Sequence, residues 1–340
     1  MHLAYPQQLK LKQQWVAEAL GRIGPVEQIT PVASPRQLGW RNRIRMHLGT
    51  RGAGFYRPGS RELVVVGRCP LAVEPVGRAM EVVGEALGGV RAFEWVELVG
   101  GREGVWAVVG VRRGVRLVEP LRRRLGRAGK VLRGLRLVRG SVAEPWPPGE
   151  DRGPMFMRSP QWKTIALPGV FCQVNFAVGQ RLVELVAELV AQGPRGQVLE
   201  LFSGGGYMSL AIASQGRHVT AVELSPEAQQ LAAWHVRKAG TEELVSLRQG
   251  DAADVTQELV SEGERYTVVV MDPPRAGAKE VARIVGSTGA ERIVYVSCHP
   301  AAMARDLGIM ASQGYRLTRA WVLDMFPHSA HVEAVAVMDR

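Results

Sequence analysis

The chain has 340 residues, 46% of them hydrophobic, and a net charge of +11. It is long enough for about two domains, each with a buried core. Its apolar runs are far shorter than the roughly 20 residues of a membrane span, and the first residues do not resemble a secretion signal. We therefore expect a cytoplasmic protein with no membrane association.

Cysteine usage agrees with a reducing compartment. Cys69, Cys172 and Cys298 are too few and too scattered for a disulfide framework. They also lack the Cys-x-x-Cys spacing of a metal site, so no metal is predicted.

The positive charge is concentrated in the first half of the chain. Residues 1–190 hold 29 Lys and Arg against 15 Asp and Glu, a balance of +14, whereas the remainder holds 14 against 17, a balance of −3. An arginine-rich genome would explain the choice of Arg over Lys but not this asymmetry. A polyanionic partner explains the asymmetry, because each neutralised phosphate releases condensed counterions.

Residues 1–35 form the first predicted segment. Apolar residues of 5–20 fall near one face of an amphipathic helix, which the prolines of 25–35 end. We expect this helix to pack on the domain formed by residues 166–340.

Residues 36–165 predict an α+β domain with hairpins, because short β-rich runs alternate with glycines. The expected strands are 43–48, 63–66, 105–111 and 131–138. The tract 112–139 is the most basic part of the chain and contains Arg122, Arg123 and Arg124. A solvated charged face would account for it, but the total charge favours a phosphate-contacting surface. Residues 145–154 predict a linker.

From residue 166 to residue 340, apolar strand-like runs alternate with helical segments, which predicts a parallel, doubly wound α/β sheet. The expected strands are 198–202, 219–223, 245–249, 266–271, 292–297, 317–323 and 332–338. The last two are joined by a loop too short for a crossover helix. They should therefore form an antiparallel hairpin.

A glycine turn, Ser203-Gly204-Gly205-Gly206, follows the strand that ends at Phe202. Glycines such as Gly204 let a ligand approach the backbone and the next helix N-terminus. About 20 residues later, Glu223 ends a strand with a carboxylate suited to ribose hydroxyls, although a surface carboxylate would look the same. Asp251 is a second candidate, for the adenine side. The turn lacks full Gly-x-Gly-x-x-Gly spacing, so S-adenosylmethionine is favoured over a nicotinamide cofactor.

Two further strands are followed by residues whose side chains could take part in binding or catalysis. Asp272-Pro273-Pro274-Arg275 follows one strand and Cys298 follows the next, so both reach the carboxyl edge where open α/β sheets bind ligands. A cysteine at a strand end is more often an inert buried residue than a nucleophile. The neighbouring Asp272 loop favours the nucleophile, with Arg275 as a substrate contact.

Five ordered motifs resemble the RNA 5-methyluridine methyltransferases. They are Phe171-Cys172-Gln173-Val174-Asn175, Leu199-Glu200-Leu201-Phe202-Ser203-Gly204, Asp272-Pro273-Pro274-Arg275-Ala276-Gly277, Tyr295-Val296-Ser297-Cys298-His299-Pro300 and His331-Val332-Glu333. In the first half, Trp40-Arg41-Asn42-Arg43 looks like the family's central domain. Arg41 and Arg43 are therefore candidate RNA contacts, together with Arg122, Arg123 and Arg124.

The resemblance implies a Rossmann-like class I methyltransferase domain with a C-terminal antiparallel hairpin, preceded by a smaller α+β central RNA-binding domain. It implies that the cofactor S-adenosylmethionine contacts Gln173, Phe202, Glu223 and Asp272. It also implies that Cys298 is the nucleophile and Glu333 the proton acceptor in methylation of uracil carbon 5. The expected partner is ribosomal or transfer RNA, and the expected state is a monomer.

Two other functions compete with this prediction. An amino-group methyltransferase would use the Asp-Pro-Pro loop to hold an exocyclic amine, but it would have no use for Cys298. A non-catalytic RNA-binding protein would not need Cys298, Asp272 and Glu333 together.

Two departures from the family pattern stand out. Tyr207 follows the glycines where the family often has a small polar residue, so the contact to the methionine part of the cofactor should differ. Many members carry an oligonucleotide-binding-type barrel and then cysteines that hold an iron–sulfur cluster. His2-Leu3-Ala4-Tyr5 resembles the sequence just after those cysteines, and Cys69 matches the remaining ligand. One cysteine cannot hold a cluster, so none is expected in this chain. Either the lineage lost both parts, or the true start lies upstream.

Overall fold

The computed structural model describes residues 3–24, 29–116, 118–139 and 153–340. The chain divides into a larger unit, residues 1–37, 160–162 and 177–340, and a smaller unit, residues 38–159 and 163–176. The smaller unit has 24 Lys and Arg against 11 Asp and Glu, whereas the larger has 19 against 21. The excess positive charge therefore belongs to the smaller unit.

An eight-stranded sheet forms the larger unit, in the order β1-β15-β16-β14-β13-β10-β11-β12. Its strands are β1 (Ile29–Val32), β10 (Val198–Leu201), β11 (Val219–Glu223), β12 (Val245–Gln249), β13 (Val268–Met271), β14 (Arg292–Ser297), β15 (Arg316–Leu323) and β16 (Glu333–Asp339). Pairs among β10 to β14 are parallel, and β16 is antiparallel to both β14 and β15. The predicted parallel sheet and C-terminal hairpin are confirmed.

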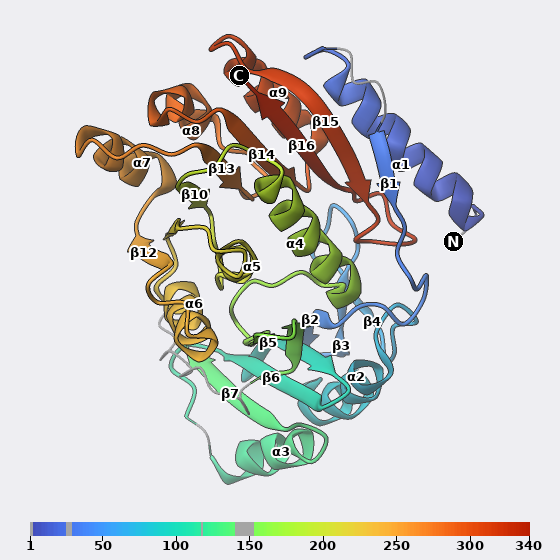
Figure 1. Ribbon diagram of the computed structural model, residues 1–340. Helices are drawn as coiled ribbons and strands as arrows, with labels where there is room; N and C mark the ends of the chain where they lie inside the picture. The colour runs from blue at the N-terminus through green and yellow to red at the C-terminus, as the bar shows by residue number, and fades with distance from the viewer. Residues whose placement is uncertain (1–2, 25–28, 117, 140–152) are drawn as a thin grey trace. The chain divides into compact units, whose positions relative to one another are not determined.

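Helices cover both faces of this sheet (Figure 1). They are α1 (Tyr5–Leu20), α4 (Phe176–Ala191), α5 (Tyr207–Ala213), α6 (Pro226–Ala239), α7 (Ala252–Ser261), α8 (Lys279–Ile284), α9 (Pro300–Ala311) and the short 3-10 helix Val285–Thr288. Leu199 of β10 shares one apolar core with residues of α1, α7, α8 and α9. The next side chain, Glu200, instead bonds Ser209 of α5. Because side chains alternate along a strand, α5 lies on the opposite face.

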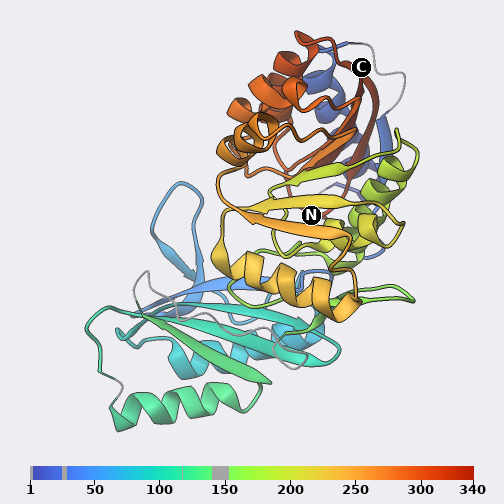
Figure 2. The ribbon, with the colours of Figure 1, turned by 60° about the vertical axis from the view of Figure 1, so that its left-hand side comes forward.

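A six-stranded sheet forms the smaller unit, in the order β4-β3-β2-β5-β6-β7. Its elements are β2 (Arg43–Gly49), β3 (Gly52–Tyr56), β4 (Leu63–Val65), α2 (Glu74–Leu87), β5 (Phe93–Gly101), β6 (Gly104–Val111), α3 (Glu119–Gly129) and β7 (Gly134–Arg139), with a separate hairpin of β8 (Met155–Arg158) and β9 (Lys163–Ile165). Figure 2 shows α2 and α3 along the same face of the sheet. Ile44 and Met46 of β2 pack in their core.

The structure differs from the sequence prediction in several places. Segment 166–176 belongs to the smaller unit, because Glu97 accepts a bond from Gly169 N and Arg43 donates to Val170 O. The basic tract 112–139 contains the amphipathic helix α3, and β7 begins later than the predicted strand 131–138. Most of the predicted linker, 145–154, lies outside the described residues. Among the described helices, none is long and apolar enough to cross a membrane.

Candidate active site

The strand register brings three predicted residues to one edge of the larger sheet. Asp272 follows β13 and Cys298 follows β14, and these two strands are parallel neighbours. Glu333 is the first residue of β16, whose second residue, Ala334, is paired with Ser297 of β14. The backbone therefore places Cys298 between the strand end at Asp272 and the strand start at Glu333.

Two carboxyl groups at this edge are shifted toward their neutral forms. Burial raises the pKa of Asp272 to about 7. Burial, and then the charge of Asp272, raises the pKa of Glu333 well above its usual range. Glu333 is 2% exposed, so little water reaches it to stabilise its charge. The two groups therefore titrate as a pair.

The Cys298 thiol experiences the same environment. Its pKa is raised, first by burial and then by Glu333 and Asp272, while a backbone hydrogen bond at Cys298 and then the Arg275 guanidinium act in the opposite direction. The side chain of the next residue, His299, is engaged elsewhere, because its Nδ1 accepts a bond from Ala302 N at 3.2 Å and caps α9. Arg275 is thus the cationic side chain that favours a Cys298 thiolate.

The glycine turn between β10 and α5 is held by Glu223. Its Oε2 accepts from Gly204 N at 2.9 Å and its Oε1 accepts from Ser225 N at 2.8 Å. Gly204 and Gly206 adopt left-handed φ values of 56° and 73°, and Phe202 adopts 62°. A left-handed Phe stores backbone strain, which is typical of a ligand-binding turn.

The turn fits a nucleoside-type cofactor. A Cβ added at Gly204 would meet no atom within 4 Å, so the backbone there faces open space beside Glu223. Ser203 Oγ is buried and, among the described residues, has no hydrogen-bond partner. Each Glu223 oxygen keeps a lone pair for a ribose hydroxyl.

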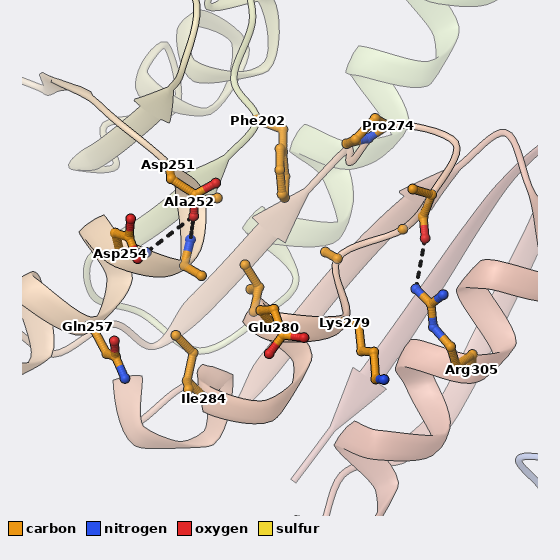
Figure 3. A pocket seen from close by; sticks show the side chains of 15 residues that line it. Phe202, Asp251, Ala252, Asp254, Gln257, Pro274, Lys279, Glu280, Ile284 and Arg305 are labelled. Carbon is orange, nitrogen blue, oxygen red and sulfur yellow. Dashed lines mark hydrogen bonds between the residues drawn. The ribbon is translucent and has the colours of Figure 1, made fainter.

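A groove of about 690 Å³ extends from this edge along α7 and α8 (Figure 3). Phe202, Asp251 and Pro274 line it, with Lys279 and Arg305 farther along. Asp251 Oδ1 caps α7 by accepting from Ala253 N, which leaves Oδ2 for a ligand. Of the predicted cofactor residues, Phe202 and Asp251 line the groove, whereas Gly204, Glu223 and Asp272 do not.

The family described as tRNA (Uracil-5-)-methyltransferase matches residues 161–340. The 23S rRNA (uracil(1939)-C(5))-methyltransferase RlmD of Pseudomonas aeruginosa is 34% identical over 99% of this chain and 77% of its own length. The chain belongs to the uracil-5-methyltransferase family. It is therefore an S-adenosylmethionine-dependent RNA uracil-C5 methyltransferase, and the amino-group and non-catalytic alternatives lose their support.

Other relatives of the methyltransferase agree. RlmD of Methylococcus capsulatus is 33% identical over 100% of this chain and 80% of its own length. The crystal structure of Pyrococcus abyssi tRNA (uracil-54, C5)-methyltransferase in complex with S-adenosyl-L-homocysteine superimposes with a TM-score of 0.77 at 22% identity, covering 99% of this chain and 84% of that one. This structure confirms the class I methyltransferase fold.

Two buried groups of the methyltransferase support the glycine turn and were missed by the sequence analysis. Burial raises the pKa of Glu200 to about 8, and its carboxyl bonds the Ser209 hydroxyl. Burial lowers the pKa of His235 to about 4, so the neutral ring donates from Nδ1 to Gly205 O at 2.8 Å. The acid at the centre of strand 198–202 was a visible signal for Glu200, whereas nothing in the helix sequence marks His235.

Tyr207, the departure from the family pattern, is buried. Its ring lies 5.5 Å from the ring of His235. It therefore packs beneath the glycine turn, against α6.

The remaining predicted residues of the methyltransferase lie in the smaller unit. Arg43 is bound to Glu97 Oε2 at 3.0 Å and to Val170 O at 2.9 Å, so its guanidinium is used within the protein. Arg41 is half-buried and donates to Arg43 O. Gln173 is also half-buried and belongs to this unit. Arg122, Arg123 and Arg124 are exposed on α3.

Proposed function

We propose that this methyltransferase methylates carbon 5 of a uridine in 23S rRNA through a covalent adduct between Cys298 and carbon 6. The observation that carries the proposal is the β14–β16 register, which sets Cys298 beside Glu333. The ribosomal substrate is proposed because the curated relatives at 33–34% identity are named for 23S rRNA. We expect a monomer that acts in the cytoplasm.

The chemistry requires a nucleophile and a base on the uracil ring. Addition of the Cys298 thiolate to carbon 6 moves the electrons of the 5,6 double bond onto carbon 5 and the carbonyl oxygen, giving an enolate. Carbon 5 of the enolate then bonds to the methyl group that S-adenosylmethionine, when bound, would supply, and S-adenosylhomocysteine would be the leaving group. Glu333, in its ionised form, then removes the proton on carbon 5. The double bond reforms and the Cys298 thiolate leaves.

Different predicted residues would hold different parts of S-adenosylmethionine. Glu223 and the backbone at Gly204 would hold the ribose, and Phe202 with Asp251 would hold the adenine. Asp272 would lie near the positively charged sulfonium of the cofactor. Gln173 stays a predicted contact on the resemblance alone.

The pKa of Asp272 makes cofactor affinity depend on pH. Because that pKa is about 7, the carboxyl is neutral in acid and loses its attraction for a positive sulfonium. We expect affinity for S-adenosylmethionine to be constant well above pH 7 and to fall below it, by at most about tenfold per pH unit. Titration calorimetry across this range measures it. S-adenosylhomocysteine, which lacks the sulfonium charge, should show a shallower dependence, and equal slopes would contradict the assignment.

Two basic surfaces of the smaller unit are candidates for RNA binding. Arg122 to Arg124 lie on α3, which covers one face of the six-stranded sheet. Arg45 alternates with the core residues Ile44 and Met46, so it lies on the other face, where its guanidinium stacks 4.3 Å from the Trp95 ring and pairs with Glu97 Oε2 at 3.1 Å. We propose that the α3 surface contacts phosphates, because its arginines are exposed.

Neutralising Arg122, Arg123 and Arg124 together to Gln should weaken RNA binding and flatten its dependence on salt. Removing one arginine–phosphate interaction should cost about 1 kcal/mol and reduce the slope of log affinity against log salt by about 0.7 to 0.9. S-adenosylmethionine affinity should not change. Filter binding across a salt series measures this, with Arg45→Gln as the matched variant on the other face. An unchanged slope in the triple variant would move the phosphate site to the Arg45 face.

The target itself is tested by nucleoside mass spectrometry. Ribosomal and transfer RNA from a strain that lacks the protein are digested and compared with RNA from the parent strain. We expect the 5-methyluridine content of 23S rRNA to fall in this strain. Loss from transfer RNA instead would reassign the substrate.

A further inference from the structure

The loop 324–332 carries the chain from β15 to Glu333, the proposed base. Asp324, at its start, is fully buried. His328, in its middle, adopts a left-handed φ of 62°, which is unfavourable for a residue with a side chain. A strained loop keeps one conformation only where its surroundings hold it there.

The first helix of the larger unit holds this loop at three points. Lys12 Nζ of α1 pairs with Asp324 Oδ1 at 2.6 Å and donates to Phe326 O at 2.9 Å. Gln8, one turn earlier on the same face, accepts from the backbone N of His328 at 3.0 Å and lies 3.1 Å from the His328 ring Nδ1. These contacts join residues that are 312 to 320 positions apart.

The polar contacts of Gln8 and Lys12 are not needed to attach α1 to the larger unit. Val16 and Leu20 already anchor the helix in the apolar core. Lys12 is 1% exposed, and a buried ammonium is costly unless a charge and hydrogen bonds compensate it. The Gln8 amide binds the loop backbone at its strained residue. Buried polar contacts of this kind fix the orientation of the loop relative to α1, in addition to holding the two together.

We propose that α1 acts as a clamp that sets the position of Glu333, with Gln8 and Lys12 as positioning residues for the proton-removal step. The inference rests on the proposed function, because it takes Glu333 to be the base. Addition of Cys298 and methyl transfer depend on β13, β14 and the glycine turn, whereas the bonds that Gln8 and Lys12 make across α1 go to the loop 324–332. Loosening the clamp should therefore slow release of methylated RNA and leave the earlier steps intact.

The test uses the full chain with Gln8→Leu, which removes the amide without leaving a buried charge. Gln14→Leu, an exposed position on the same helix, is the matched control. We expect Gln8→Leu to transfer methyl groups in a single turnover at the normal rate. Its multiple-turnover rate should fall at least about tenfold, with a denaturant-stable adduct accumulating on ordinary RNA. The double variant Lys12→Met, Asp324→Asn, which removes both buried charges, should behave in the same way.

The possible outcomes distinguish a failure of the clamp proposal from a failure of the covalent mechanism. If single-turnover and multiple-turnover rates fall in parallel without adduct, or if neither changes, α1 is only a structural element and the proposal is wrong. If unsubstituted enzyme forms no adduct even with 5-fluorouracil RNA, the covalent mechanism fails instead. Thermal unfolding and S-adenosylmethionine affinity, measured for each variant, exclude general unfolding as the cause.

Discussion

Replacing Cys298 by Ala should abolish methyl transfer, by at least about a thousandfold, while S-adenosylmethionine still binds. Without the thiolate, carbon 5 of uracil is a poor nucleophile, and the other residues of the site cannot supply the missing covalent step. Single-turnover transfer of a labelled methyl group to RNA measures the loss. Cys69→Ala, in the smaller unit, is the matched control and should stay active.

RNA with 5-fluorouracil at the target gives a direct test of the same residue. After methyl transfer the fluorine at carbon 5 cannot be removed as a cation, so the enzyme should stay attached through Cys298. Formation of this adduct should require S-adenosylmethionine. An active enzyme that forms no adduct with this RNA would rule out Cys298 as the nucleophile.

Glu333→Gln should still add to uracil and methylate it but should release product about a hundredfold to ten-thousandfold more slowly, the usual range for a general base. Adduct should then accumulate with ordinary RNA. Gel mobility under denaturing conditions detects it. Glu291→Gln is the matched control, because Glu291 lies just before β14, at the opposite end of that strand from Cys298.

The wild-type rate should also fall in acid, because burial and Asp272 raise the pKa of Glu333. Its ionised form, which accepts the proton, is then scarce. Fast turnover of the Glu333→Gln variant would reassign the base to another carboxylate at this edge, with Asp272 as the first candidate.

The sheet edge that carries Asp272, Cys298 and Glu333 could be predicted from sequence because each of these residues lies at the end of a strand. Asp272, Cys298 and Glu333 each adjoin an apolar run, and parallel strands bring their carboxyl ends together. The antiparallel hairpin then returns Glu333 to the same edge. Glu223 could be predicted in the same way, since the chain length from Phe202 fits one crossover helix.

Other contacts could not be predicted because no local pattern encodes them. Lys12 looks like one more charge on an amphipathic helix until Asp324 is found beside it. Arg43 resembled an RNA contact, but Glu97 and Val170 occupy its guanidinium. The arginines of the basic tract hid the amphipathic helix α3, because their charge was a stronger signal than the apolar spacing of Leu125 and Ala128.

The pairing of Ser297 with Ala334 fixes the backbone spacing between the two strands that carry the thiol and the carboxylate. Neighbouring strands are about 4.8 Å apart, and a slip of one residue turns every side chain to the other face. A single insertion inside β16 would thus turn Glu333 toward the other face of the sheet and away from Cys298. We therefore expect length changes inside these two strands to be tolerated less well than length changes in the turns outside them.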